Sequence, residues 1–484
     1  MKLNNPELLR SQCLINGEWC DALSGKREAV INPATGAELA SIPLVSEEET
    51  QQAIAAAQRA QNDWKQLTAK QRSALLLAWA DKVLAAQEDL AQLMTAEQGK
   101  SLAEARGEVA YAASFITWFA EEAKRVDGAV LQAPQASQRL VVVKQPIGVC
   151  AAITPWNFPA AMITRKVAPA LAAGCAIIVK PAEQTPLTAL ALAKLAQDAG
   201  IPAGVLQVVT GEAAQVGKVL CDSPVVRKLS FTGSTEVGRI LMAQCAPSIK
   251  KLSLELGGNA PVIVFDDANL DAAVAGIMAS KFRNSGQTCV CANRIYVQDG
   301  IYERLAEKLV VAVEQLKVGD GSQEGTTQGP LIDSDAVAKV QSHIDDALIK
   351  GAQIATGGQP HALGGTFFQP TVVTGVTQKM RFAKEETFGP VAPLFRFHDE
   401  AEAIAMANDT EFGLAAYLFT QNAARQWRVP EALEYGMVGI NTGLISNEVA
   451  PFGGVKQSGL GREGSRYGIE EYLELKYLCI DVSC

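Results

Sequence analysis

Between about residues 147 and 256, short apolar runs alternate with segments of helical character, and this alternation restricts the possible folds. The apolar runs are residues 149–153, 176–179, 205–209, 228–231 and 252–256. The helical segments between them are residues 159–173, 185–199, 213–221 and 235–245. Continuous apolar strands that alternate with helices are typical of a parallel sheet covered on both faces. We therefore expect a doubly wound α/β domain, which binds its ligand at the carboxyl ends of the strands.

The rest of the chain predicts further structure around this domain. Its first part has a helical character: capping boxes at residues 46–49 and 101–104 predict helices that run to residue 64 and to about residue 125. Residues 140–144 and 472–482 are strand-like, and strands and helices alternate again between about residues 261 and 440. Because 484 residues exceed one compact core, we expect two or three domains.

Charge and hydropathy exclude several classes of protein. A net charge of −9 gives no electrostatic footprint for nucleic acid or for an anionic membrane, so neither is expected as a partner. The first ten residues lack the apolar core of a secretory signal. The longest apolar stretch, residues 167–179, is too short to span a bilayer. We therefore expect a cytoplasmic location.

The cysteines and histidines constrain the chemistry. A large chain without a leader is expected to keep its ten cysteines reduced. Four of them have apolar or helical surroundings that predict a place in the core: Cys150, Cys175, Cys221 and Cys245. The three histidines lack the spacing of metal ligands, so no metal site is predicted: His343, His361 and His398.

Five short motifs carry candidate chemistry. Cys289 follows small and polar residues, as an exposed functional thiol would, although most single cysteines are buried packing residues. Glu255 ends an apolar run before two glycines, where a carboxylate is costly to bury unless it is used or paired. Asn157 follows the first parallel strand, where it could also cap the next helix ahead of Pro159.

The other two motifs suggest a ligand at the carboxyl ends of the strands. Lys180 ends a buried strand and would face the ligand crevice. Ser234 lies in a Gly-Ser turn that opens a helix, where backbone N–H groups and the helix dipole favour a phosphate. An ordinary helix cap or strand end explains each of these motifs when it is taken alone. No G-x-G-x-x-G fingerprint occurs near the strands.

Together and in this order, the motifs resemble the aldehyde dehydrogenase superfamily along essentially the whole chain. The matching stretches are residues 155–159, 180–186, 231–238, 254–259, 286–289, 385–390 and 451–454. The resemblance implies an NAD(P)-binding domain of residues 1–126 and 147–255 and an α/β catalytic domain of residues 256–469. It also implies a small β-rich oligomerisation arm of residues 127–146 and 470–484, and hence a homodimer or a homotetramer.

The resemblance also implies the catalytic roles. Cys289, as thiolate, would add to an aldehyde and form a thiohemiacetal. The Asn157 amide and the Cys289 backbone N–H would stabilise the oxyanion. After hydride transfer to the nicotinamide, Glu255 would activate water to hydrolyse the thioester.

The cofactor site follows from the same resemblance. Lys180 and Glu183 would hold the adenosine ribose, Ser234 the pyrophosphate and Glu386 the nicotinamide ribose. In this family a carboxylate at position 183 bonds both ribose hydroxyls and repels a 2′-phosphate, which implies NAD over NADP, although Lys180 keeps NADP possible. The remaining cofactor contacts implied are Ile153, Trp156, Gly211, Gly217, Gly233, Leu256 and Phe388.

The substrate is narrowed by a closer resemblance to succinate-semialdehyde dehydrogenases in residues 161–166, 281–294, 443–448 and 451–465. Arg165, Arg283 and Ser446 would bind a distal carboxylate, for which arginine is a forked partner. A surface or interdomain ion pair is the alternative for each arginine. Glutarate semialdehyde, one methylene longer, stays open as a substrate because one methylene discriminates by only about 1–3 kcal/mol.

Two further alternatives depend on cysteine chemistry. The spacing of Cys289 and Cys291 resembles a reversible disulfide switch, with a passive packing role for Cys291 as the alternative. A thiol hydrolase would need a histidine beside Cys289, and no histidine lies in the motifs around that residue. A non-catalytic relative is disfavoured because Cys289, Glu255 and Asn157 are all present, and a CoA-acylating enzyme is disfavoured by the presence of Glu255.

Overall fold

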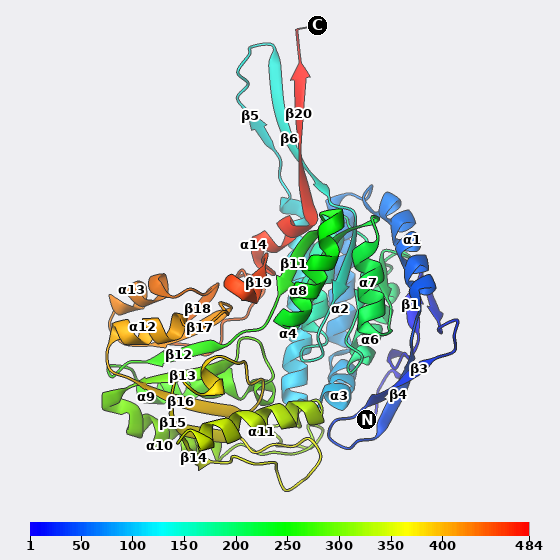
Figure 1. The fold of residues 1–484 in the computed structure, drawn as a ribbon. Coiled ribbons are helices and arrows are strands. Elements are labelled where there is room, and N and C mark those ends of the chain that lie inside the picture. The colour runs from blue at the N-terminus through cyan, green and yellow to red at the C-terminus, as the bar shows by residue number, and fades with distance from the viewer. Residues whose placement is uncertain (484) are drawn as a thin grey trace.

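The computed structural model describes residues 1–483, which form two large sheets flanked by helices and a β-arm that extends away from them (Figure 1). The helices are α1 (Glu47–Trp64), α2 (Ala69–Ala85), α3 (Gln87–Gln98), α4 (Leu102–Glu122), α5 (Ala161–Ala173), α6 (Pro186–Asp198), α7 (Ala213–Asp222), α8 (Thr235–Cys245), α9 (Leu270–Lys281), α10 (Tyr302–Val313), α11 (Ser334–Ile349), α12 (Glu400–Asn408), α13 (Arg425–Ala432) and α14 (Ser465–Gly468). The strands are β1 (Cys13–Ile15), β2 (Glu18–Cys20), β3 (Arg27–Ile31), β4 (Glu38–Pro43), β5 (Ala129–Leu131), β6 (Gln138–Pro146), β7 (Val149–Ile153), β8 (Ile177–Lys180), β9 (Leu206–Val208), β10 (Val226–Thr232), β11 (Lys251–Glu255), β12 (Ala260–Val264), β13 (Ala292–Gln298), β14 (Gln353–Thr356), β15 (Thr371–Val376), β16 (Val391–Phe397), β17 (Ala415–Phe419), β18 (Met437–Ile440), β19 (Gly459–Leu460) and β20 (Leu473–Asp481).

The first sheet has the order β19-β11-β10-β7-β8-β9-β1-β2. Its five central strands, β11 to β9 in this order, are parallel to one another. They coincide with the five predicted apolar runs, and α5 to α8 occupy the predicted helical segments between them. The strands are apolar throughout because helices cover both faces, so the predicted doubly wound α/β domain is confirmed.

The amino-terminal strands were not predicted, and the helical reading of the first part of the chain is wrong there. β1 and β2 form a hairpin whose turn is Asn16-Gly17, with φ of 52° and 80° at the two residues. These positive φ values match a two-residue hairpin turn, for which Asn-Gly is the strongest sequence signal. Through the Leu14 and Val208 pairing, β1 extends the first sheet beyond β9 in antiparallel fashion.

The predicted helix starts are confirmed in two cases and wrong in one. Both capping boxes, at Ser46 and Ser101, form as expected. α4 ends at Glu122, slightly earlier than expected, because a separate turn of 3-10 helix covers the next three residues. α5 begins at Ala161, two residues after Pro159, and has no side-chain cap, so Asn157 is available for another role.

The second sheet has the order β14-β15-β16-β13-β12-β17-β18, in which only β14 is antiparallel to its neighbour. The arm consists of β20-β6-β5, and β6 pairs with β20 along their full lengths. The arm stands clear of the two large sheets, and the end of β20 lies at its tip (Figure 1). Residue 484, the last residue of the expected arm, lies outside the described residues.

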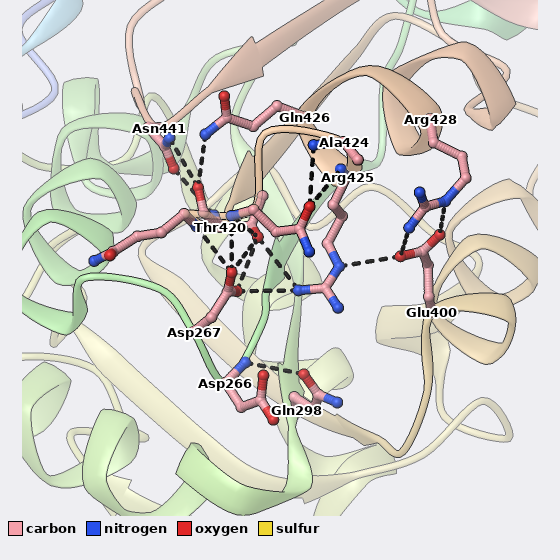
Figure 2. A network of polar contacts seen from close by, with 12 residues as sticks. Asp266, Asp267, Gln298, Glu400, Thr420, Ala424, Arg425, Gln426, Arg428 and Asn441 are labelled. Atoms are coloured by element: carbon pink, nitrogen blue, oxygen red, sulfur yellow. Dashed lines mark hydrogen bonds and ion pairs between the residues drawn. The ribbon is translucent and has the colours of Figure 1, made fainter.

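The first sheet has the carboxyl ends of its parallel strands at the space between the two sheets, and the second sheet has the amino ends of its strands there. The carboxyl ends of β7, β8, β10 and β11 lead into the predicted motifs of the first sheet, and the amino ends of β12, β13 and β16 follow the motifs of the second. The carboxyl ends of β12, β17 and β18 instead carry a polar network around Asp267 (Figure 2). The Asp267 carboxylate accepts hydrogen bonds from Thr420 Oγ1 at 2.8 Å and Arg425 Nη1 at 3.1 Å, and Arg425 also pairs with Glu400. This network fixes the loops at that end of the sheet, away from the motifs.

Within residues 1–483, no helix is both long and apolar enough to cross a membrane. The four cysteines assigned to the core, Cys150, Cys175, Cys221 and Cys245, are all buried and free, as predicted.

Candidate active site

The nucleophile loop is a left-handed turn that ends at Cys289. Asn284, Ser285 and Gly286 have φ of 50°, 54° and 75°, a conformation that costs energy for the two residues with side chains. A Cβ on Gly286 would lie 2.1 Å from the Gly389 carbonyl oxygen, so only glycine fits there. The turn directs the half-exposed Cys289 into a cavity of about 350 Å³ between the two sheets.

Asn157 lines the same cavity, and hydrogen bonds tie its turn to the nucleophile loop. Its side-chain Nδ2 donates to the Gln287 carbonyl oxygen at 3.0 Å. In return, Asn284 Nδ2 donates to the Asn157 carbonyl oxygen at 3.0 Å and to the Gln287 carbonyl oxygen at 3.2 Å. An amide nitrogen has two N–H groups, so Asn157 keeps a second donor for a ligand in the cavity.

A buried ion pair lies beneath the Asn157 turn. Lys100 Nζ is 2.5 Å from Glu108 Oε2 and also donates to the Asn157 carbonyl oxygen at 2.8 Å. Glu108 Oε1 accepts from the backbone N–H groups of Ala160 and Ala161, at the start of α5. Both charged side chains are almost fully buried, so the turn before α5 is fixed by groups that water does not reach.

Glu255 ends β11 and lines the cavity together with Cys289. It is 3% exposed, and neither carboxylate oxygen has a hydrogen-bond partner among the described residues. Burial raises the pKa of Glu255 well above its ordinary value, and the negative charge of Glu463 raises it further. A buried carboxyl of this kind stays protonated to a higher pH than an exposed one, and its carboxylate is a stronger base than an exposed carboxylate.

Behind Glu255, Glu463 is paired with two cations. Arg165 Nε is 2.9 Å from Glu463 Oε2, and Lys166 Nζ donates to Glu463 Oε1 and to Thr232 Oγ1. Although burial opposes ionisation, the charges of Lys166 and Arg165 hold the pKa of Glu463 below its ordinary value. Two neighbouring carboxyls thus have pKa values moved in opposite directions, an arrangement typical of acid–base sites.

The environment of Cys289 sets its reactivity. Burial raises the pKa of the thiol to about 12, the charge of Glu386 adds to this effect, and the charge of Arg165 opposes it. Cys291 is fully buried, and its sulfur accepts a hydrogen bond from Lys281 Nζ at 3.2 Å. Both thiols are free in the structure, and a reversible disulfide between them stays a prediction.

One end of the cavity carries the predicted nicotinamide-side residues. Glu386 Oε1 accepts from the Gly258 N–H at 3.1 Å, and burial raises the pKa of Glu386 to about 7. The rings of Trp156 and Phe388 meet edge-on with centroids 5.6 Å apart. Ser234 caps α8, its hydroxyl accepting from the Val237 N–H at 3.3 Å. Gly233 and Leu256 line the cavity as well.

Lys180 and Glu183 form an ion pair at the carboxyl end of β8, outside this cavity. Glu183 lines a second hollow of about 1010 Å³, which also contacts Glu28 and Glu212. Burial raises the pKa of Glu28, and the charge of Glu183 raises it further. The two hollows share Ile332 and Asp333 in their walls, so they adjoin.

The remaining predicted cofactor residues lie near the starts of α7 and α8 rather than in the wall of either hollow. A Cβ on Gly217, in α7, would lie 3.8 Å from Ile153 and 3.7 Å from Leu241. Gly211 lies against the Val45 carbonyl oxygen, where a Cβ would be 3.0 Å away. These contacts place Gly217 of α7 next to Ile153 of β7 and Leu241 of α8, and Gly211 next to Val45.

The three predicted substrate residues also lie outside the wall of the first cavity. Arg165 is 1% exposed, stacks on Phe452 at 3.9 Å, and has a buried Nη2 without a hydrogen-bond partner among the described residues. Arg283 is half-buried over Phe158 at 4.8 Å and has no ion pair within residues 1–483. Ser446 is half-buried in the loop after β18. Arg165 therefore combines a structural ion pair with a free donor.

None of the three histidines hydrogen-bonds to Cys289 within the described residues. His343 comes nearest to the predicted motifs, because its ring contacts Thr387 Oγ1 and Glu385 Oε2, both at 3.2 Å. Burial lowers the pKa of His343 to about 4. Since both ring nitrogens are occupied, His343 supports the loop that carries Glu386.

Five functional candidates were absent from the predicted residues: Lys100, Glu108, Lys166, Asn284 and Glu463. A charged side chain on the apolar face of a helix was the available signal for Glu108 in α4 and Lys166 in α5. The left-handed φ of Asn284 has no sequence signal beyond the tolerance of asparagine for that conformation.

Comparison with known proteins gives consistent results. The model of the Aldehyde dehydrogenase family matches residues 19–478. A succinate-semialdehyde dehydrogenase (NADP+) of Escherichia coli strain K12 is 65% identical over 480 residues, covering 99% of this chain and 100% of the relative. A glutarate-semialdehyde dehydrogenase of Pseudomonas putida is 64% identical over 482 residues, covering 100% of each chain.

Solved structures agree with these relatives. A crystal structure of succinate-semialdehyde dehydrogenase from Burkholderia pseudomallei is 63% identical, covers 100% of each chain and superimposes with a TM-score of 0.99. The family match spans both large sheets and most of the arm, and the cavity holds Cys289, Asn157 and Glu255 together. The chain therefore belongs to the aldehyde dehydrogenase family.

Proposed function

We propose that this aldehyde dehydrogenase oxidises succinate semialdehyde to succinate with reduction of NAD(P)+. The observation that carries the chemistry is the single cavity that brings Cys289, Asn157 and Glu255 together. The substrate is supported by two buried or half-buried arginines near that cavity and by the succinate-semialdehyde names of two relatives at 65% and 63% identity. The relative at 64% identity bears a glutarate-semialdehyde name instead.

The chemistry proceeds on the side chains of the cavity. The Cys289 thiolate adds to the aldehyde carbon, and the carbonyl oxygen becomes an alkoxide that the Asn157 amide and the Cys289 N–H stabilise. Loss of hydride from that carbon leaves a thioester on Cys289. Glu255, once ionised, removes a proton from water as the water attacks the thioester, which releases the acid and the Cys289 thiolate.

The residues present fit a dinucleotide cofactor. Carboxylates lie at both ends of the adjoining hollows, Glu386 at one and Glu183 at the other, and each can accept from ribose hydroxyls. Between them, the amino end of α8 offers backbone N–H groups to a pyrophosphate. When bound, the nicotinamide accepts the hydride that leaves the substrate carbon.

We infer that NAD is preferred over NADP. Glu183 supports this inference because its carboxylate would repel a 2′-phosphate, and Glu28 and Glu212 in the same hollow add negative charge. The Escherichia coli relative bears an NADP(+) name, so the inference depends on these carboxylates of this chain and not on that relative. Glu183→Ser is expected to raise kcat/KM with NADP, and equal or better use of NADP by the unchanged protein would contradict it.

The arm is proposed to join subunits into a dimer or a tetramer. Its outer strand, β20, has a free edge within residues 1–483, and it exposes Leu475 and Tyr477. We also propose that residues 1–126 and 147–255 bind the cofactor and that residues 256–469 supply the nucleophile. Residues 459–460, which belong to the range 256–469, pair with β11 and so add a strand to the first sheet.

Steady-state kinetics tests the proposal. The protein is mixed with succinate semialdehyde, glutarate semialdehyde or butanal, each with NAD and with NADP, and the formation of NAD(P)H is followed. We expect kcat/KM for succinate semialdehyde to exceed that for butanal by at least about 100-fold, because a charge-assisted carboxylate contact contributes about 1.5–3 kcal/mol and two arginines are available. A higher kcat/KM for glutarate semialdehyde would favour that substrate instead.

A further inference from the structure

Tyr111 lies on α4 in a position that the proposed chemistry does not explain. Its ring meets Phe115, one helical turn later, edge-on with centroids 4.9 Å apart. Its hydroxyl oxygen is completely buried and has no hydrogen bond of good geometry among the described residues. A buried hydroxyl without a partner is unfavourable, so this arrangement points to a ligand that is absent from the structure.

Two cations, Arg165 and Arg283, and one carboxylate, Glu463, act on this hydroxyl, and the carboxylate is already paired with Arg165 and Lys166. Arg165 lies over the same Phe115 ring, with its guanidinium carbon 5.4 Å from the ring centroid. Burial raises the pKa of Tyr111, and the positive charges of Arg165 and Arg283 oppose that rise. Arg165 Nη2 is itself buried without a partner. The Tyr111 hydroxyl and Arg165 Nη2 are thus two buried groups without a hydrogen-bond partner among the described residues, and both side chains contact the Phe115 ring.

The loop after β18 contributes a further polar side chain near the Tyr111 hydroxyl. The Ser446 side chain approaches the Tyr111 hydroxyl. Ser114, on the same helix as Tyr111, donates from Oγ to Glu448 Oε2 at 3.3 Å and so ties α4 to that loop. The loop and the helix are thereby held at a fixed separation, with Tyr111 and Ser446 next to each other.

We propose that the Tyr111 hydroxyl donates a hydrogen bond to the distal carboxylate of the semialdehyde, beside Arg165, Arg283 and Ser446. This inference rests on the proposed function and extends it to a further specificity residue. An anion is the ligand that suits the site, because the Tyr111 hydroxyl and Arg165 Nη2 can each donate a hydrogen bond to it and two of the neighbours, Arg165 and Arg283, are cations.

Tyr111→Phe tests the proposal while keeping the ring that packs on Phe115. The KM for succinate semialdehyde is expected to rise about tenfold with kcat nearly unchanged, as expected for the loss of one hydrogen bond to a charged group. The KM for butanal, which has no carboxylate, should change less than about twofold, an estimate that assumes no other contact is lost. The inhibition constant of succinate should rise in parallel with the KM for the semialdehyde.

Tyr467→Phe is the matched control, because Tyr467 is half exposed on α14 and its hydroxyl contacts only Arg466 among the described residues. It should alter neither KM. Equal changes for both aldehydes in Tyr111→Phe, or no change in either, would overturn the role of Tyr111 and leave the proposed function standing. A lack of preference for succinate semialdehyde over butanal in the unchanged protein would instead overturn the proposed function, and with it the carboxylate ligand of Tyr111.

Discussion

The side chain of Asn157 donates a 3.0 Å hydrogen bond to the main-chain oxygen of Gln287, two residues before Cys289. This bond joins the turn after the first parallel strand to the loop that carries the nucleophile. The two segments come from different sheets and are 130 residues apart in the sequence. Because the second N–H of the Asn157 amide is free for the cavity, the same residue that aligns the loops is placed to stabilise an oxyanion on the substrate.

Asn157→Ala is expected to lower kcat by about 10²–10³-fold, the usual effect of removing one oxyanion donor. KM should change much less, because the amide acts on charge that develops only in the transition state. Steady-state kinetics on succinate semialdehyde measures both constants. Thermal unfolding of the variant serves as the control, since a large loss of stability would assign the effect to the broken loop contact.

Glu255→Gln is expected to separate the two halves of the reaction. Acylation of Cys289 does not need the carboxylate, so a rapid first burst of NAD(P)H should remain, whereas turnover should fall by about 10²–10⁴-fold. Stopped-flow absorbance resolves the burst from the steady state. A burst that disappears in proportion to turnover would show that Glu255 acts before the thioester forms.

The steady-state rate is expected to rise with pH. Burial raises the pKa of Glu255 well above its ordinary value, so its carboxylate, the form that acts as base, accumulates only as pH increases through that raised pKa. The raised pKa of Cys289, about 12, acts in the same direction, because the thiolate fraction also grows with pH. Rates measured from pH 6 to 9 in the unchanged protein and in Glu255→Gln distinguish the two, because only the contribution of Glu255 is lost in the variant.

The parallel strands of the first sheet could be predicted from sequence because they are buried on both faces. Their apolar runs at residues 149–153 and 252–256 end where the structure has β7 and β11 end, to within one residue. β3 and β4 pair with each other as a separate small sheet whose residues are mostly exposed or half-buried, so a search for continuously buried strands could not find them. The exposed arm strands β6 and β20 were indicated by their strand-like sequence and not by burial.

The residues of the site also fall into two groups: those that the sequence could indicate and those that it could not. Glu255 and Asn157 were found because each ends or follows an apolar run, and Cys289 because small and polar residues precede it. The structure brings all three into one cavity. Glu463 and Lys100 could not be found, because their importance depends on burial next to residues far away in the sequence. The partners of a buried charge are a property of the tertiary structure, and no local pattern specifies them.

Gly258→Ala is expected to reduce activity strongly. A Cβ at this position would lie 2.3 Å from the Cys289 carbonyl oxygen, so the nucleophile loop would have to move. A displacement of about 1 Å at a reacting group can cost about 10²-fold in rate. Gly107→Ala in α4 is the matched control, because no atom lies within 4 Å of its Cβ position. That control should keep full activity and gain about 0.5–1 kcal/mol of helix stability.

Glu108→Ala is expected to destabilise the protein by about 3–5 kcal/mol, because it leaves Lys100 as an unpaired buried charge. Burial lowers the pKa of Lys100, and the charge of Glu108 opposes that effect in the unchanged protein. The double variant Lys100→Met with Glu108→Leu should lose much less stability, since both charges are removed together. Urea unfolding at constant pH measures the three proteins.

The same variants should separate stability from catalysis. Lys100 also donates to the Asn157 carbonyl oxygen at 2.8 Å, so the double variant loses a contact that positions the oxyanion donor even where its stability is retained. We therefore expect kcat of the double variant to fall while its unfolding midpoint drops less than that of Glu108→Ala. Part of the stability loss remains, because the Ala160 and Ala161 N–H groups no longer have the Glu108 carboxylate as acceptor. A double variant with normal kcat would show that the hydrogen bonds from Asn284 and to Gln287 suffice to hold Asn157 in place.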